Sequence, residues 1–418
     1  MFVQPARKVL VMVYRLRKVI QIATHDGRWR HDTRQAHSVR FNSTQHDTCL
    51  SFRKFFHLLP PYTSKHRVGE KKPLVRLREL PSMSDTTTAL PAGLATLEKR
   101  TDIIKALMND KFDPKVFAWQ GFKHGLGWIV QEYLPGEQLS LHFSDLQTDK
   151  KAVVLDQVAE IFKMIQSFQH GVEGFGGLGF DGKGSVVAGR SSLWSVGPFS
   201  THAGMYRAIF AKQLDLIQIT PLLDGWKGTG LQERLQKLNA SGGFANLLAY
   251  TANIQPTLVH GDFGAENILI NPDTLQITGL PDFVFSHIAS PADEYFYSFP
   301  SFSGLVLGPF EDEDLQLLRR YQTEGSPSTP SAQEATSKSV DWTVARLWQA
   351  ALEKHNVASP KDIENITQLA DIYWFLLDVC PPFFNLPRWL ARKTDEQKLA
   401  AKKVIGENLD RYLRRWDY

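Results

Sequence analysis

Cysteine is scarce in this chain: Cys49 and Cys380 are the only two among its 418 residues. Their separation fits neither zinc-ligand spacing nor a redox pair, which excludes both kinds of site. Two ordinary thiols are typical of a protein in a reducing compartment. Long apolar runs are lacking as well, because the run from Val9 to Tyr14 is interrupted by Arg15. The sequence therefore predicts a soluble protein without a membrane span.

Basic residues are in excess only at the start of the chain. Residues 1–60 hold eleven lysines and arginines against three aspartates, which leaves 37 basic and 41 acidic residues, a net charge of −4, for residues 61–418. The folded part is mildly acidic and shows no basic patch for a nucleic acid, so no such partner is expected. Residues 1–24 are rich in arginine and contain no acidic residue. They are either a mitochondrial targeting segment or a poorly ordered arm.

The most specific pattern is Leu258-Val-His-Gly-Asp-Phe-Gly-Ala-Glu-Asn-Ile-Leu-Ile270, followed by Ile277-Thr-Gly-Leu-Pro-Asp-Phe283. An aspartate, an asparagine five residues later and a second aspartate stand in the order that kinase-type phosphoryl transfer uses. Mg²⁺ takes oxygen ligands, typically one or two carboxylates plus phosphates and water, and Asn267 and Asp282 fit that role. Asp262, kept off the metal, fits a base that accepts the proton of an attacking hydroxyl. The alternative is a surface hairpin whose polar residues only cap turns.

Short apolar runs bounded by turn residues surround this pattern. They predict strands at 257–259, 268–270 and 275–280, with a turn over 271–273. Such a hairpin holds all three polar residues at one rim. Pro281 has no amide proton to donate to a neighbouring strand, so it has to lie at a strand end or edge.

The segments His260-Gly-Asp-Phe-Gly-Ala-Glu-Asn267 and Ile277-Thr-Gly-Leu-Pro-Asp282 resemble the aminoglycoside phosphotransferase (choline kinase-like) family. The likeness is greatest to a fungal branch of phosphotransferase enzymes that includes the altered-inheritance-of-mitochondria proteins. Supporting segments are Gly27-Arg-Trp29, Arg40-Phe-Asn42, 94–100, 127–136, 286–293 and 371–375. The resemblance implies an α+β, protein kinase-like fold of two lobes: a small N-lobe with an antiparallel sheet and a larger, mostly helical C-lobe.

These observations predict three parts of the chain. They are the arm 1–24, a lead-in, N-lobe and hinge over 25–136, and a helical C-lobe over 137–418 that contains the catalytic hairpin 257–283. Residues 324–339 are rich in Ser, Thr and Pro and predict a flexible loop within the C-lobe. The resemblance also favours a mitochondrial location, with the cytoplasm as the alternative.

Nucleotide-binding residues are expected in the N-lobe and hinge, by the same resemblance. Arg76 lies near the place where family members carry a phosphate-contacting lysine or arginine, with Arg78 as the same-face alternative; otherwise both are solvated strand residues. Glu98, on a predicted N-lobe helix, either tethers Arg76 or belongs to a solvated helix face. Backbone groups around Gln131 and Tyr133 are expected to bind the adenine edge.

One feature of the family is missing. The predicted N-lobe has no evident glycine-rich turn to cover the nucleotide phosphates, and Val68-Gly69-Glu70 contains a single glycine. A deleted or wrongly joined segment within 54–72 would explain the gap. The glycine-dense segment 171–184 follows a predicted helix and lacks Gly-Lys-Ser/Thr, which indicates a connector, not a phosphate cradle.

Apolar residues at helical spacing predict the helices of the C-lobe. Thr148 is expected to cap the first helix, which runs to Phe168. The others are predicted at about 341–354, 360–379 and 394–415.

Two functions follow. In the first, the protein is a small-molecule kinase that moves the γ-phosphate of ATP, with Mg²⁺, to a hydroxyl of a small acceptor. In the second, it is a pseudokinase or binding module that keeps the fold without a working phosphate-covering loop, and the resemblance implies a role in mitochondrial maintenance. The three polar residues favour the first function, and the missing glycine turn favours the second. The sequence identifies neither the acceptor nor the oligomeric state.

Overall fold

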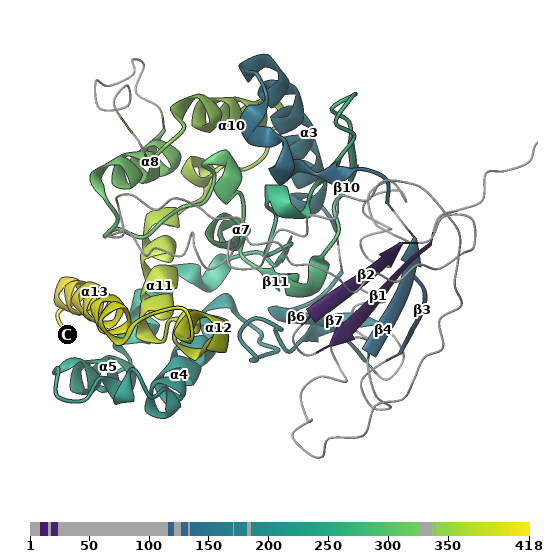
Figure 1. Ribbon diagram of the computed structural model, residues 1–418. Coiled ribbons are helices and arrows are strands. Elements are labelled where there is room, and N and C mark those ends of the chain that lie inside the picture. The colour runs from purple at the N-terminus through teal and green to yellow at the C-terminus, as the bar shows by residue number, and fades with distance from the viewer. Residues whose placement is uncertain are drawn as a thin grey trace, which may run out of the picture. The chain divides into compact units, whose positions relative to one another are not determined.

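The computed structural model describes residues 134–169, 171–181, 185–325, 337 and 339–418, and the backbone alone of residues 9–15, 18–23, 116–120, 127–132, 180 and 252 (Figure 1). The chain forms two compact units. Of the described residues, unit 1 contains those before 143 together with 266–284, and unit 2 contains those in 143–265 and 285–418.

Unit 1 is built from small antiparallel sheets. Its strands are β1 (Val9–Arg15), β2 (Lys18–Ala23), β3 (Val116–Gln120), β4 (Gly127–Glu132), β5 (Glu137–Gln138), β9 (Leu269–Ile270) and β10 (Ile277–Gly279). One sheet has the strand order β2-β1-β4-β3, and the other has the order β10-β9-β5. Strands β1 and β2 lie within residues 1–24, where the sequence predicts an arm. The difference has a local reason, since the segment VLVMVYR is rich in the β-branched residues that favour strands.

Unit 2 contains the α-helices of the described residues and a four-stranded antiparallel sheet of order β7-β6-β11-β8. The strands are β6 (Gly176–Phe180), β7 (Val186–Gly189), β8 (Thr257–Val259) and β11 (His287–Ala289). The helices are α3 (Thr148–Gln166), α4 (His202–Ile219), α5 (Leu231–Ala240), α6 (Gly243–Leu247), α7 (Pro291–Tyr297), α8 (Glu313–Glu324), α10 (Trp342–Lys354), α11 (Ile366–Val379), α12 (Pro387–Leu390) and α13 (Asp395–Arg415). The small sheets of unit 1 and the helical unit 2 confirm the α+β class and the two lobes that the sequence predicts.

The long helices confirm the apolar spacing, with differences at their ends. Gln147, not Thr148, is the N-cap residue of α3, and no side chain caps that end. Helix α11 begins only at Ile366, because Asn365 adopts a left-handed backbone conformation with φ of 59°. None of the helices in the described part of the chain is long and apolar enough to cross a bilayer. The predicted loop 324–339 lies mostly outside the described residues, so its flexibility stays a prediction.

The glycine-dense segment is predicted as a connector. The structure corrects this prediction, because the segment contains strand β6. In its pairing with β7, Gly177 lies opposite Gly189. A Cβ on Gly177 would lie 2.2 Å from the carbonyl oxygen of Arg190, and one on Gly179 would lie 3.3 Å from Gly189 Cα. A side chain is therefore excluded at Gly177, and at Gly179 it requires the neighbouring strand to shift by a few tenths of an ångström.

Helix α11 lies at the centre of the helical packing in unit 2. Helices α4 and α13 both contact it (Figure 1). The ring of Phe375, which is fully buried, packs against Phe210 of α4, Phe244 of α6 and Tyr412 of α13. Burying large aromatic side chains provides most of the favourable free energy of such a core.

A buried group of charges joins three of these helices. Asp371 of α11 accepts hydrogen bonds from Arg319 of α8 at 2.6 Å and from Arg415 of α13 at 2.9 Å. Arg319 and Asp371 have side chains that are each 7% exposed. Arg319 also donates to the carbonyl oxygens of Leu307 (2.8 Å) and Thr367 (3.0 Å). Its guanidinium group is thus held by three partners inside the protein.

Candidate active site

The predicted hairpin forms in unit 1 from β9 and β10. Ile277 pairs with Ile270, and Gly279 pairs with Leu269. Asn271 closes the turn: its carbonyl oxygen accepts from the amide of Leu275 at 2.9 Å, and its side-chain oxygen accepts from the amide of Asp273 at 2.9 Å. Asparagine favours such turns because its side chain hydrogen-bonds the backbone two residues on.

Asn267 and Asp282 lie at the same end of this hairpin, opposite the turn. Asn267 ends a 3₁₀ turn two residues before β9, and Asp282 follows β10 by three residues. Pro281 lies beyond the last residue of β10, so its missing amide proton costs the strand pairing nothing. Asp282 has φ of 71°, a left-handed conformation that aspartate tolerates better than most residues.

The side-chain oxygens of Asn267 and Asp282, at this end of the hairpin, are suitable ligands for a magnesium ion. The part of the chain that the structure describes has no cluster of three or more His, Cys, Asp or Glu side chains placed to hold a metal. Mg²⁺ does not require one, because it usually takes one or two protein oxygens and fills its other positions with phosphate and water. Asp282 as a whole is exposed to solvent. Its carboxyl group is nevertheless shielded from water by the surrounding protein, which raises the pKa of that group, and the hydrogen bond from the amide of Val284 opposes the shift. A bound cation would favour the ionised carboxylate there.

Strand β5 ties the predicted hinge to the same hairpin. Its residues pair with β9, and the amide of Leu139 donates to the carbonyl oxygen of Ile268 at 2.8 Å. Gly136 has φ of 128°, and a Cβ there would lie 2.9 Å from the carbonyl oxygen of Ile270. Thr278 also donates from its hydroxyl to the carbonyl oxygen of Pro135. Only a glycine lets the chain pass this close to β9.

Asp262 lies in unit 2, on the turn that follows β8. Strand β8 pairs with β11, not with β9, which corrects the expectation of a single hairpin over 257–283. Gly261 makes the turn possible with φ of 80°. A Cβ on this residue would lie 2.8 Å from the carbonyl oxygen of Phe285. The structure thus places Asp262 in one unit, and Asn267 and Asp282 together in the other.

Glu294 of α7 binds the backbone of this turn. Its carboxylate accepts from the amide of His260 at 2.6 Å through Oε2, and from the amide of Gly261 at 3.1 Å through Oε1. Glu294 is 2% exposed. Burial raises the pKa of this carboxyl to about 7, against the opposing hydrogen bonds from Ser298 and from the two amides.

The next two amides of the turn are bound as well. The amide of Asp262 donates to Nδ1 of His260 at 3.2 Å, and that of Phe263 donates to the hydroxyl of Ser298 at 2.8 Å. Four consecutive backbone donors are therefore satisfied by side chains, which fixes the direction of the turn. The buried ring of Phe263 packs edge-on against Phe162 of α3, so the turn is also anchored in the core.

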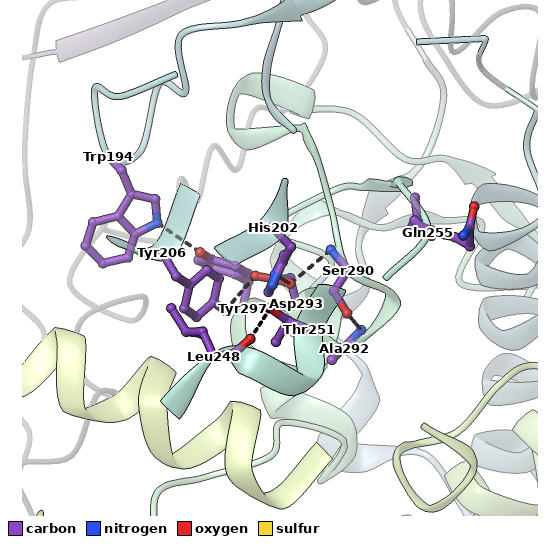
Figure 2. Close-up of polar contacts among 11 residues, drawn as sticks. Trp194, His202, Tyr206, Leu248, Thr251, Gln255, Ser290, Ala292, Asp293 and Tyr297 are labelled. Carbon is purple, nitrogen blue, oxygen red and sulfur yellow. Dashed lines mark hydrogen bonds and ion pairs between the residues drawn. The ribbon is translucent and has the colours of Figure 1, made fainter. Parts of the chain in front are cut away.

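Helix α7 is held in turn by its neighbours in unit 2 (Figure 2). Figure 2 shows His202 and Tyr206 of α4 pointing at Asp293, whose carboxylate accepts from them at 2.9 Å and 2.8 Å. Burial alone would raise the pKa of Asp293, but the interactions with His202 and Tyr206 outweigh it and lower that pKa. Trp194 donates to the hydroxyl of Tyr297 at 3.0 Å. Since α7 is fixed at both ends, Glu294 is fixed as well.

The sequence analysis missed Glu294 and Ser298. A local signal exists, because Ser290 and Asp293 form a capping box that marks the start of a helix. The helix that follows contains the run Tyr295-Phe-Tyr297, and its residues from 292 to 297 are buried. An acidic residue inside so apolar a helix has to find donors in the interior, and this indicates a buried carboxylate with a positioning role.

Most of the residues predicted to bind the nucleotide are not among the residues that the structure describes. Arg76, Glu98 and Tyr133 lie outside the described residues, and their roles stay predictions. Gln131 is in β4, where it pairs with Leu10 on one side and Val116 on the other. Its contact with adenine also stays a prediction.

We expect Gly261→Ala to lower the free energy of unfolding by about 2–4 kcal/mol, because both the left-handed backbone and the clash with Phe285 oppose a Cβ. Gly228→Ala is the matched control: Gly228 has φ of 70° and no atom within 4 Å of the added Cβ. Its expected cost is about 1 kcal/mol, from backbone strain alone. Urea denaturation of both variants measures the difference, and equal losses would show that the close approach of Phe285 is unimportant.

Comparisons with known proteins show which family the chain matches. The family model described as "Phosphotransferase enzyme family" (APH) matches residues 91–332. A search of curated proteins finds no significant match. Among solved structures, similarity is found to a putative aminoglycoside phosphotransferase from Ralstonia eutropha, at 13% identity over 78% of this chain and 84% of that one, with a TM-score of 0.42. A thermostable mutant of APH(4)-Ia in a ternary complex with AMP-PNP and hygromycin B has 14% identity, coverage of 76% and 82%, and a TM-score of 0.41. Scores this low add nothing to the family match.

Proposed function

Because the chain belongs to the phosphotransferase enzyme family, we propose that it transfers the γ-phosphate of ATP to a hydroxyl group of a small molecule. Asp262 is the proposed base, which accepts the proton of the attacking hydroxyl. Asn267 and Asp282 are the proposed magnesium ligands, and Mg²⁺, when bound, neutralises charge on the phosphates. The observation that carries the proposal is the turn at Asp262, whose amides are all bound by side chains, since phosphoryl transfer depends mainly on positioning.

Three further points belong to the same proposal. The acceptor is a small hydroxyl compound of unassigned identity, because the hygromycin B of the APH(4)-Ia complex is a ligand of that protein. The likeness to the fungal branch, and with it the mitochondrial location, rests on the quoted segments and on the arginine-rich residues 1–24. Arg76 is proposed to steady the phosphates, with Glu98 orienting it.

A thermal shift with ATP tests the nucleotide site. If the dissociation constant is ~10 μM, then ~1 mM ATP with Mg²⁺ adds about 2.7 kcal/mol to the stability. For a chain of this size the melting temperature should rise by roughly 3–6 °C. We expect the magnesium-dependent part of the shift to vanish in Asp282→Ala, which removes the carboxylate ligand.

Asp273→Ala is the control for this experiment, because Asp273 is an exposed carboxylate on the turn of the same hairpin. It should keep the full shift. A magnesium-independent shift in the unchanged protein, or an equal loss in both variants, would reject Asp282 as a ligand. The absence of any shift with ATP would favour the pseudokinase instead.

A further inference from the structure

The carboxyl group of Glu294 binds two successive backbone amides of the turn that carries Asp262. Each of its oxygens accepts one amide of the turn, from His260 at 2.6 Å and from Gly261 at 3.1 Å, and Oε1 also accepts from the hydroxyl of Ser298. An ionised carboxylate is an acceptor at both oxygens, whereas a protonated one presents a donor at one of them. Protonation therefore weakens at least one of the two contacts. No water can replace the lost acceptor easily, since Glu294 is 2% exposed.

We propose that Glu294 is a proton-operated lock on the turn that carries Asp262. In the ionised state it holds the amides of His260 and Gly261, and in the protonated state it releases one of them and the turn opens more often. The catalytic consequence rests on the proposed function of Asp262. The lock itself concerns backbone contacts within unit 2 and can be tested without any nucleotide or acceptor.

The lock operates in the neutral range. Burial raises the pKa of Glu294 from its ordinary value of 4.5 to about 7, so the group is mostly protonated below this pH and ionised above it. A surface glutamate stays ionised throughout the neutral range and would not respond. The turn is accordingly held at mildly alkaline pH and loosened at mildly acidic pH.

Several other titratable groups lie around Glu294. Burial raises the pKa of Tyr295 and of Tyr297, so both stay neutral, and Asp293 stays ionised because its pKa is lowered. His260 has a separate contact with the turn: its Nδ1 accepts from the amide of Asp262, which a protonated imidazole cannot do. Further titratable groups at α7 are His202, Tyr206, His287 and Tyr373, which interact with Asp293, and Asp362, which interacts with Tyr295.

Amide hydrogen exchange of the full-length protein, resolved to single residues, tests the lock. Exchange is measured at about pH 6 and about pH 8 and corrected for the intrinsic pH dependence of amide exchange. We expect the protection of the His260 and Gly261 amides to be ~10-fold higher at the higher pH. The amides of β8 are the internal reference, because their strand pairing contains no Glu294 contact. Equal protection of the turn at both values would overturn the proposal.

The variant Glu294→Gln distinguishes a pH response caused by Glu294 from one caused by His260. Glutamine cannot ionise and presents an amide donor beside one of the turn's N–H groups, so protection should be low and should not change with pH. Glu160→Gln, an exposed substitution on α3, should behave like the unchanged protein. If Glu294→Gln kept the original pH dependence, His260 would be the switch and the proposal would be wrong. If this variant does not fold, the pH series of the unchanged protein decides.

These outcomes are independent of the thermal shift with ATP. A pH-dependent turn in a protein that binds no nucleotide would reject the phosphotransferase and keep the lock. Nucleotide binding with a pH-independent turn would reject the lock and keep the phosphotransferase.

Discussion

Asp262→Asn should lower turnover by about 10²–10⁴-fold, the range that a positioned general base contributes. The amide side chain has almost the same shape as the carboxylate, but it cannot take the proton of the attacking hydroxyl. The hydrogen bonds to Glu294 and Ser298 come from the backbone of the turn, so the variant should keep its fold. The affinity for ATP with Mg²⁺ should stay within about twofold, since the proposed metal ligands are unchanged.

Phosphate transfer from labelled ATP to a panel of small hydroxyl compounds provides the rate, and the thermal shift provides the affinity. Asp273→Asn, the same chemical change on the exposed turn of the hairpin, is the matched control and should keep full turnover. Undiminished turnover in Asp262→Asn would show that another group accepts the proton. A loss confined to nucleotide affinity would instead indicate that Asp262 acts on the metal.

Arg319→Met should be the most destabilising of the substitutions considered, at about 3–5 kcal/mol. The side chain of Asp371 is 7% exposed and burial raises the pKa of its carboxyl, so without Arg319 it either keeps a charge in the interior, with Arg415 as its remaining arginine partner, or takes up a proton at a cost. The carbonyl oxygens of Leu307 and Thr367 lose a donor at the same time. Methionine preserves most of the apolar stem, so the loss reports the charge and the hydrogen bonds and not an empty space.

Arg320→Met is the control, because Arg320 is the exposed neighbour on the same helix. It should change the free energy of unfolding by less than about 0.5 kcal/mol. Urea denaturation measures both variants. Equal stabilities would mean that the buried charges contribute little more than surface charges do. Replacing Arg319 and Asp371 together by apolar residues should recover part of the loss, because the charge that then loses its partner is that of Arg415, whose side chain is 55% exposed.

The features that the sequence predicts correctly are local. The hairpin of β9 and β10 follows from apolar runs on either side of Asn271, and the helices α10 and α13 follow from apolar spacing within one segment. The same holds for the positions of Asn267 and Asp282, which the hairpin brings to one end. Each of these predictions needs only the order of residues along a short stretch.

The features that the sequence does not predict depend on distant partners. Strand β8 could pair with either neighbour by its own composition, and its partner is β11 because α7 follows β11 and binds the turn. Glycines in β6 favour a loop by propensity, yet the close approach of β7 overrides that preference. Glu294 likewise looks like a solvated acid until the helix around it is known to be buried.

The contacts between the turn and α7 also bear on the order of folding. The bond between His260 and Glu294 closes a loop of 34 residues, whereas the bond between Gln166 and Ala358, beside the packing of α3 on α10, closes one of 192. By the logarithmic dependence on loop length, the shorter closure costs about 1.5 kcal/mol less chain entropy. The turn and α7 can therefore assemble before α10 reaches α3. The proposed catalytic aspartate would then take up its position on an early-forming part of unit 2, independently of the slow, long-range contacts that complete it.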